Sequence, residues 1–489
     1  MSSGDDIDEL NARRICWRCI GEAYLSDEIK QKDDGDAPCS YCGETEPSYT
    51  IEELAERIEA AFEHHFDRTS NQPTAWQYSL MSDGESSYEW ERDGLPVLDA
   101  IEQAAEIPSA AAEDVVAVLG AKHEDIEAAQ MGEETEFASD SYYEEKGPND
   151  QAWQEEWNSF ERSLKTEARF FSRTAGSHLA SIFGGIDQLQ TSDDSPLVVE
   201  AGPQLAIDHL YRARVFQADC KLEEALCRPD LHLGPPSAVL ANAGRMNARG
   251  ISVFYGATES ATAVAEVRPP VGSKVAVASF SIIRTLRLLD LTALEKVQDG
   301  GSIFDPTSRA RMERVAFLQT LGRRMTRPVM PDDEAFDYLA TQVIADFLAT
   351  ENEPVLEGII FRSAQVSEGR NVVLFHKAAR VEAMELPEGT ELRAHSSTDT
   401  DEGPEIDYRV TEEVPSPPGA LPATSDDSEW PGFPSKLQAE MHHPDPDFRE
   451  ATLRIDPATI EVHHVAWVHF HCTAHSVSRH RYEKHEPDF

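Results

Sequence analysis

Apolar side chains recur at intervals of three and four over parts of the first 200 residues, a pattern typical of helices with one buried face. Thr50 and Glu53 predict a capping box before the first helix. Ser109 is the predicted cap of a second helix, and a third begins near Asp150. The predicted buried positions are Ile51, Leu54, Ile58, Phe62 and Phe66, then Val115, Val116 and Leu119, then Trp153, Trp157, Phe160, Leu164 and Phe171.

The pattern changes after residue 205 to short β-rich runs that alternate with helices. The segment 192–203 combines Ser, Asp, Pro and Gly and predicts a boundary ahead of these runs. Together the two halves indicate an α+β protein. The predicted strands are 207–216, 252–255, 274–280, 358–361, 371–375 and 460–470, and the predicted helices are 258–267, 305–321 and 332–350.

The charge of the chain disfavours whole classes of partner. Its 43 Lys and Arg residues against 90 Asp and Glu residues give a net charge of −47. This surface repels nucleic-acid phosphates and anionic membranes, so a nucleic-acid partner is unlikely. No apolar run approaches the roughly 18 residues of a membrane span. The acidic, polar N-terminus differs from a targeting peptide, and we expect a cytoplasmic protein.

Four of the seven cysteines form two Cys-x-x-Cys pairs, Cys16 with Cys19 and Cys39 with Cys42. Two such pairs, separated by 19 residues, supply the four thiolates of a tetrahedral zinc site. A redox pair would not require a second copy of the motif. The spacing therefore predicts a small zinc ribbon, and four thiolates leave no open position, so the zinc is structural.

The segment 244–267 contains the candidate catalytic and binding residues. A loop with Arg245 leads into a strand ending at Tyr255, and a helix then presents Glu266. The guanidinium of Arg245 is suited to holding a phosphate, and the ring of Tyr255 to stacking on a flat base. Glu266 lies in a largely apolar helix, where an unpaired carboxylate is costly. Each residue alone also has an ordinary structural explanation.

In combination these residues resemble the RES family, which is named for its arginine, glutamate and serine and is known for toxins that deplete NAD⁺. The resemblance includes the loop Gly244-Arg245-Met246-Asn247, in which methionine replaces the usual aromatic residue. Tyr255 and Glu266 follow at the family's distances. The remaining matches, in order, are Tyr211-Arg212 in the opening strand, residues 337–342 in a helix, residues 357–363 with Ser363, and residues 369–375 in the last core strand.

The resemblance implies an ADP-ribosyltransferase-like fold that cleaves the nicotinamide–ribose bond of NAD⁺, as a glycohydrolase or a phosphorylase. Because this cleavage builds positive charge on the ribose, Glu266 would stabilise the cation or fix the 2′-hydroxyl. Ser363 would bond near the nicotinamide ribose, and Tyr255 would stack on nicotinamide. Arg245 would grip the pyrophosphate, with Arg212 and Asn247 as further binding residues. A transferase acting on a protein target is the alternative.

The resemblance also suggests a domain order. We expect a zinc ribbon at 1–48, a helical HEPN-like domain at 49–200 and a RES catalytic domain at 205–385. An acidic, poorly ordered insertion at 386–440 and a strand in 441–489 that completes the RES domain follow. The expected partners are NAD⁺ and an antitoxin or regulatory protein. HEPN domains include ribonucleases with an Arg-x4–6-His motif, which Arg173 and His178 fit; a purely regulatory front half is the other reading.

Overall fold

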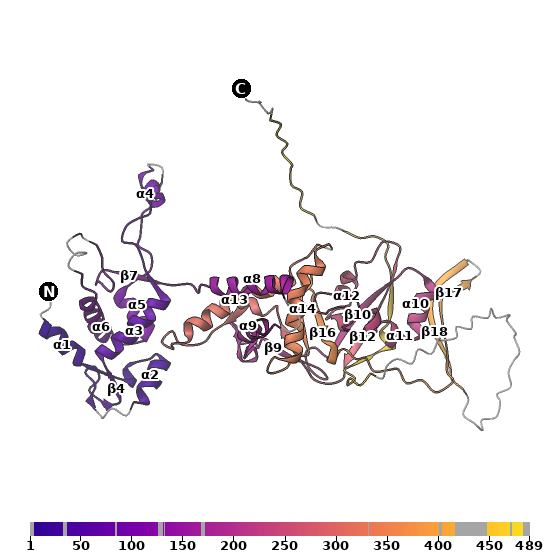
Figure 1. The fold of residues 1–489 in the computed structure, drawn as a ribbon, viewed down its shortest axis with the longest axis horizontal. Helices are drawn as coiled ribbons and strands as arrows, with labels where there is room; N and C mark the ends of the chain where they lie inside the picture. Colours follow the sequence, from indigo (N-terminus) through magenta and orange to yellow (C-terminus); the bar gives the residue numbers. More distant parts are fainter. Residues whose placement is uncertain are drawn as a thin grey trace. The chain divides into compact units, whose positions relative to one another are not determined.

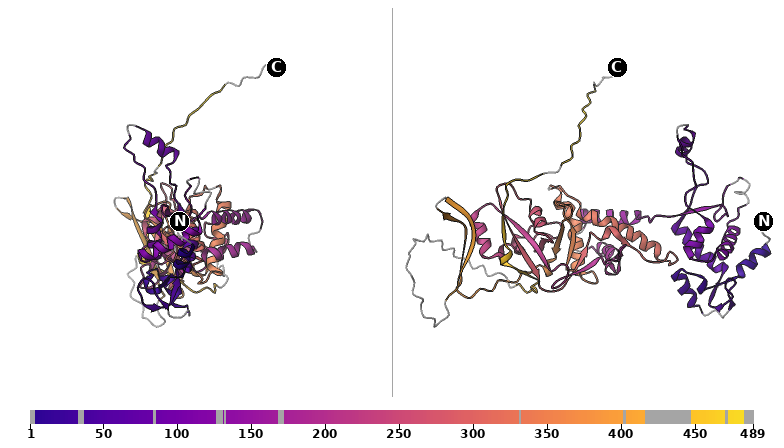
Figure 2. Two further views of the ribbon diagram at one scale, coloured as in Figure 1. Left: turned by 90° about the vertical axis from the view of Figure 1, so that its left-hand side faces the viewer. Right: turned by 180° about the vertical axis from the view of Figure 1, so that it is seen from behind.

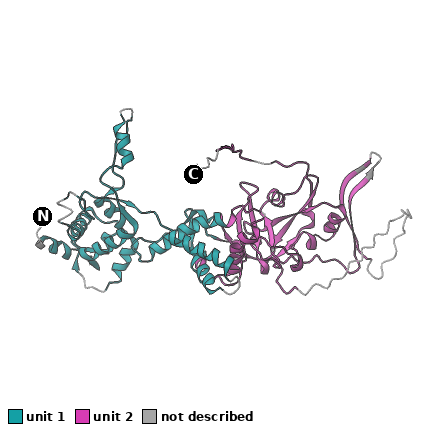
Figure 3. Cartoon of the chain, turned by 45° about the horizontal axis from the view of Figure 1, so that its top comes forward, with its two compact units in different colours: residues 1–182, 186–197, 293–324 teal, residues 183–185, 198–292, 325–489 magenta. Residues whose placement is uncertain are grey.

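A computed structural model describes residues 4–32, 37–83, 86–125, 131, 133–167, 172–330, 332–400, 403–415, 447–469 and 472–482. The chain forms two compact units (Figure 3). Unit 1 comprises residues 1–182, 186–197 and 293–324, and unit 2 comprises residues 183–185, 198–292 and 325–489. Residues 293–324, which lie inside the predicted catalytic segment 205–385, therefore belong with the N-terminal unit.

The cysteine ribbon and the following helices of unit 1 share one core, although we expected separate segments. The ribbon consists of short strands, β1 (Arg14–Cys16), β2 (Ala37–Pro38), β3 (Thr45–Glu46) and β4 (Ser48–Thr50), with α1 (Gly4–Ala12) before them and α2 (Ala23–Lys30) among them. Ile15, Leu25 and Ile29 pack in the same buried cluster as the helical residues Leu54 and Phe62. The ribbon thus has no core of its own.

The predicted start of α3 (Ile51–His65) is confirmed. The Thr50 hydroxyl accepts from the Glu53 N–H at 3.2 Å, and the Glu53 carboxylate accepts from the Thr50 N–H at 2.9 Å. The predicted cap of α6 (Ser109–Lys122) is wrong. Pro108 takes the cap position, and the Ser109 hydroxyl donates instead to the Glu102 carboxylate at 2.6 Å. The helix α5 (Val97–Ala105) packs in the same core.

A second group of helices in unit 1 joins distant parts of the sequence. It contains α8 (Gln151–Thr166), α9 (Arg173–Phe183) and α13 (Ser308–Thr326) (Figure 1). Trp157, Phe160 and Leu164 are buried as predicted, and Trp153 and Trp157 lie 5.8 Å from the ring of Phe317. The helix ends at Thr166, and Phe171 lies outside the described residues. Two short strands, β8 (Gln190–Thr191) and β14 (Val297–Gln298), pair nearby.

Unit 2 is built on a nine-stranded, mostly antiparallel sheet with the order β19-β12-β10-β11-β16-β15-β13-β9, in which β20 also pairs with β12. Six of the strands correspond to predicted ones, with shifted ends. β9 and β13, which pair with each other, and β19 were not predicted. The strands are β9 (Val198–Ala201), β10 (His209–Phe216), β11 (Phe254–Ala257), β12 (Lys274–Ile282), β13 (Leu286–Asp290), β15 (Gly358–Arg362), β16 (Arg370–Leu374), β19 (Leu453–Ile455) and β20 (Glu461–His464).

Helices lie against both faces of this sheet (Figure 2). One face packs in the main buried cluster with α10 (Asp219–Cys227) and with Leu233, which follows α11 (Pro229–His232). The other face packs against α12 (Ser260–Glu266), whose Ala263 lies against Ala257 of β11 and Val277 of β12. Unit 2 also contains α14 (Glu334–Thr350), in which Ile344 and Phe347 are buried as predicted, whereas Phe336 is exposed.

The described part of the acidic insertion is more ordered than expected. Two long strands, β17 (Glu391–Thr400) and β18 (Gly403–Glu413), form a hairpin. Ala394 and Tyr408 of the hairpin pack against the main cluster of unit 2. Residues 416–440 of the predicted insertion lie outside the described residues. In the described part of the chain, no helix combines the length and apolar character of a membrane span.

The assignment of residues 293–324 to unit 1 makes a stability prediction. Phe304 is 4% exposed in the core of the N-terminal helices, and its carbonyl accepts from Arg57 at 3.0 Å. Phe304→Ala should therefore lower the free energy of unfolding of unit 1 by about 3 kcal/mol. Five of the seven tryptophans precede residue 160, so tryptophan fluorescence in a denaturant titration reports on this unit.

Phe336→Ala is the matched control, because Phe336 is 56% exposed and belongs to unit 2. It should change the same transition by less than about 0.5 kcal/mol. An unchanged transition in the Phe304 variant would contradict the placement of this segment.

Candidate functional site

The four paired cysteines converge in unit 1. Their Sγ atoms all lie within 4.8 Å of one another. Cys16 and Cys42 are 3.5 Å apart, Cys16 and Cys19 3.8 Å, and Cys19 and Cys39 3.9 Å. A tetrahedron of thiolates around zinc, with bonds of about 2.3 Å, has edges of roughly 3.8 Å. The four residues therefore fit a metal ion, as the spacing predicted.

In unit 2, the loop after α11 is organised around a buried amide. The Nδ2 group of Asn247 donates to the carbonyl oxygens of Asn242 at 2.9 Å, Ala248 at 3.2 Å and Ile251 at 3.0 Å. Its Oδ1 atom accepts from the Tyr255 hydroxyl at 3.0 Å. Because both amide donors are engaged within the loop, Asn247 shapes the loop and offers no free donor to a ligand.

The Tyr255 hydroxyl connects β11 to the same loop. It also accepts from the Met246 N–H at 3.0 Å, and burial raises the pKa of Tyr255 to about 12. The phenol thus stays protonated at physiological pH. A Cβ atom on Gly244 would lie 2.7 Å from Asn247 Oδ1 and 2.8 Å from the Tyr255 oxygen, so this position requires glycine.

Arg245 is held by Met325, in the last turn of α13 and part of unit 2, and by α14. Its Nη1 atom donates to the Met325 carbonyl at 2.9 Å, and its guanidinium lies 4.9 Å from the ring centroid of Tyr338. Two side chains of α14 fix the loop backbone: Thr341 donates to the Arg245 carbonyl at 2.5 Å and Gln342 to the Gly244 carbonyl at 2.8 Å. Among the described residues, Arg245 makes no other side-chain hydrogen bond, so Nε and Nη2 remain available.

Glu266, at the end of α12, is held by two side chains from distant strands. Its Oε1 atom accepts from the Ser363 hydroxyl at 2.5 Å and from Asn371 Nδ2 at 2.8 Å. The Ser363 oxygen in turn accepts from the N–H groups of Gln365 and Val366 at 3.0 and 3.1 Å. Among the described residues no donor reaches Oε2 of Glu266, so one carboxylate oxygen is fixed and the other is open to a ligand.

The strand register brings the two groups to the same face of the sheet. Tyr255 is paired with Val373, and Ala257 with Asn371. Side chains alternate along a strand and directly paired residues share a face, so Tyr255 and Asn371 lie on the same side. They are offset by two residues, which is roughly 7 Å along the strand. Glu266 is on that side too, because α12 packs there.

Arg212 lies elsewhere. Its guanidinium is 5.1 Å from the ring of Phe254, which alternates with Tyr255 and thus faces the other side of the sheet. Beyond the single pair Tyr211 and Ala257, β10 and β11 share no register. The Nη1 atom of Arg212 is buried without a hydrogen-bond partner in the described residues, and burial together with the nearby Arg214 lowers its pKa to about 9.

The comparison with known protein families agrees with this arrangement. Residues 222–396 match the RES domain, and residues 32–178 match HEPN/RES N-terminal domain 1. The chain contains a RES domain. Proteins with RES domains are in general NAD-related enzymes or toxins, usually of toxin–antitoxin systems. Neither a curated protein nor a solved structure matches the chain at a significant level.

The matched part of the RES domain contains Arg245, Tyr255, Glu266 and Ser363, and it begins after Arg212. It also contains residues that we did not predict for the site. The sequence alone predicts an ordinary core-strand position for Asn371 and positions in a family helix for Tyr338, Thr341 and Gln342. An asparagine in an otherwise apolar strand, Asn371-Val372-Val373-Leu374, was the available signal for the first of these.

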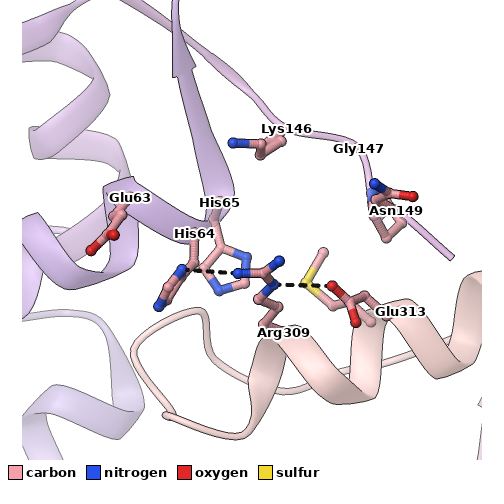
Figure 4. A pocket seen from close by; sticks show the side chains of 10 residues that line it. Glu63, His64, His65, Lys146, Gly147, Asn149, Arg309 and Glu313 are labelled. Atoms are coloured by element: carbon pink, nitrogen blue, oxygen red, sulfur yellow. Dashed lines mark hydrogen bonds and ion pairs between the residues drawn. The ribbon is translucent and has the colours of Figure 1, made fainter. Parts of the chain in front are cut away.

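An open hollow in unit 1 contains none of the predicted site residues (Figure 4). It lies among the end of α3, residues 146–149 and the first turns of α13. Arg309 there is already paired with Glu313 at 3.0 Å and lies 3.4 Å from His64. Lys146 is paired with Asp67 at 2.8 Å. Because its cations are neutralised by neighbours, we do not assign this hollow a role in catalysis.

The geometry does not favour the ribonuclease alternative. His178 packs against Trp157 and Phe160, and burial lowers its pKa. Arg173 is exposed on the same helix, α9, and five residues correspond to about 140° around a helix. The two side chains thus diverge, and His178 Nδ1 instead lies 3.3 Å from the Glu156 carboxylate.

The cysteine cluster makes a prediction about metal content. Because all four thiolates complete one tetrahedron, Cys39→Ser should lose the bound zinc and destabilise unit 1, whereas wild type carries one zinc per chain. Elemental analysis and a thermal melt measure both effects.

Cys220→Ser is the control, since Cys220 is exposed and lies far along the chain in unit 2. It should retain its zinc. Full zinc occupancy in the Cys39 variant would show that the ligand set is wrong.

Proposed function

We propose that the RES domain breaks the bond between nicotinamide and ribose in NAD⁺. The observation that supports this most directly is the Glu266 carboxylate, whose Oε1 is held by Ser363 and Asn371 while Oε2 is open. Cleavage of this bond develops positive charge on the ribose. A carboxylate fixed in advance stabilises such charge without the cost of reorienting at the moment of reaction.

The roles of the other residues follow from their contacts. The Nε and Nη2 donors of Arg245 suit the pyrophosphate. The ring of Tyr338 packs against the guanidinium. The ring of Tyr255 would stack on a flat ring such as nicotinamide. The Ser363 hydroxyl donates a hydrogen bond to Glu266, so we assign Ser363 a positioning role. Asn247 likewise positions the loop, and a direct role for Arg212 is not part of this proposal.

We further propose that the fold of unit 2 is ADP-ribosyltransferase-like and that the chain acts as a toxin or defence effector restrained by an antitoxin. The support is the RES match and the central sheet whose β10 and β11 are joined by one residue pair. The acceptor is water or phosphate in this proposal. A protein acceptor is the second candidate, and the product analysis below separates the three.

The central test is Glu266→Gln. The substitution keeps the size of the side chain but removes its charge, so the rate of NAD⁺ cleavage should fall by about 100- to 1,000-fold. The assay is chromatography of purified protein incubated with NAD⁺, with and without phosphate. Free nicotinamide with ADP-ribose would indicate hydrolysis. A phosphorylated ADP-ribose would indicate phosphorolysis, and a modified polypeptide would indicate transfer to protein.

Glu259→Gln provides the control, because Glu259 is exposed at the start of the same helix and its side chain makes no cap bond. Its rate should stay within about twofold of wild type. Equal activity of the two variants would remove the basis of the proposal.

Asn371→Ala tests the support of the carboxylate separately. Losing one hydrogen bond to Oε1 leaves the charge but loosens its position, so kcat should fall about tenfold with little change in KM. A change confined to KM would instead assign Asn371 to substrate binding. Circular dichroism establishes that the variant is folded.

A further inference from the structure

Residues 69–83 and 86–94 belong to an arm of unit 1 that extends between two strands of one sheet (Figures 1 and 2). The strands β5 (Phe66–Arg68) and β6 (Leu95–Pro96) flank β7 (Tyr142–Glu145) in a three-stranded sheet. At the tip of the arm lies the helix α4 (Ala75–Ser82). The arm thus begins and ends on neighbouring parts of one sheet.

The base of the arm is held by two hydrogen bonds and an ion pair. Thr69 Oγ1 donates to the Asp93 carbonyl at 2.8 Å, and Arg92 donates to the Thr69 carbonyl at 2.7 Å. Arg92 also pairs with Glu134 at 2.7 Å, with both side chains largely buried, and lies 4.8 Å from the ring of Tyr142. A buried pair with several hydrogen bonds holds its geometry, so the arm leaves the sheet from a fixed point.

The sequence of the tip encodes a helix, but none of its side chains is buried against the described residues. Thr74 and Gln77 form a complete capping box, with bonds of 3.3 and 2.7 Å. The helix has eight residues, and no side chain of α4 is buried. Helices this short are marginal in water unless they pack against something. The sequence therefore specifies a helix whose stabilising contact comes from outside the described chain.

The exposed side chains of the tip are those that dominate protein interfaces. Trp76 is 69% exposed, Tyr78 50% and Met81 47%. Trp and Tyr are the residues most enriched among interface hot spots, and Met is enriched as well. The helix has no charged residue, in a chain with a net charge of −47. Asp83, Glu89 and Glu91 follow it in the arm.

We propose that this arm is a docking element that inserts α4 into an apolar groove of a basic partner protein. At about 100° per residue, Tyr78 and Met81 share one side of the helix and Trp76 lies on the other. The groove would therefore enclose the helix and contact both sides. Basic residues on the rim of the groove would face the acidic residues after α4, and the net charge of the chain would speed the encounter. This inference does not rest on the proposed enzymatic function.

A second copy of this chain is a poorer occupant. The exposed parts of the three side chains amount to about 350 Å² per copy, so two tips would bury about 700 Å². Specific interfaces require about 1,000 Å² or more. Two acidic arms would also repel each other. A groove that encloses the helix buries a larger area and removes both objections.

Site-specific photo-crosslinking in the cells that produce the protein tests the proposal. A benzophenone amino acid replaces Tyr78 in the full-length chain, and the adduct is identified by mass spectrometry. The adduct should contain one protein of net positive charge. That protein, once purified, should bind the wild-type chain with an affinity that falls as salt increases.

Trp76→Ala should weaken this binding about tenfold or more without changing the melting temperature, because α4 buries nothing. Trp467→Ala is the matched control, since Trp467 is 77% exposed and lies in unit 2, and its affinity should stay within about twofold. Adducts with an acidic protein, a lipid or a second copy, the absence of an adduct, or equal affinity of both variants would overturn the proposal.

Discussion

The candidate site depends on the hydrogen bonds that fix one carboxylate. Glu266 ends a seven-residue helix, and its Oε1 is held by Asn371 from β16 and by Ser363 from the turn after β15. The helix is placed by the contact of Ala263 with Ala257 and Val277. Because a shift of one residue rotates a helical side chain by about 100°, this packing decides whether the carboxylate meets its donors. An unsupported carboxylate in this partly buried position would be costly.

A second set of hydrogen bonds holds the loop that contains Arg245. The buried amide of Asn247 and the hydroxyl of Tyr255 close the loop, and α14 holds its backbone through Thr341 and Gln342. The acceptor of Arg245 is the Met325 carbonyl, in the last turn of α13. The segment before this helix is anchored in the core of unit 1 by Phe304. The N-terminal unit is therefore continuous along the chain with Met325, whose carbonyl positions Arg245.

The helices and strands predicted correctly are those with a capping motif, a helical periodicity or a β-branched run in their own sequence. The capping box of α3, the stripe of α8 and the strands β10, β12, β15 and β16 were evident from periodicity and β-branched runs. β9 looked like a linker because turn residues flank it, and only its pairing with β13 makes it a strand. Periodicity predicted α13, although it does not reveal which core a helix joins. Asn371 lies at the site because its strand pairs it with Ala257. This pairing cannot be seen in the local sequence.

The account is tested most directly by a crystal structure of the Glu266→Gln variant soaked with NAD⁺. It predicts the nicotinamide ribose beside residue 266, with its 2′-hydroxyl within hydrogen-bonding distance of the side-chain atom at the Oε2 position. The nicotinamide ring would lie against Tyr255 and the pyrophosphate at Arg245. NAD⁺ bound elsewhere, for example in the hollow near His64 and Arg309, would contradict the account.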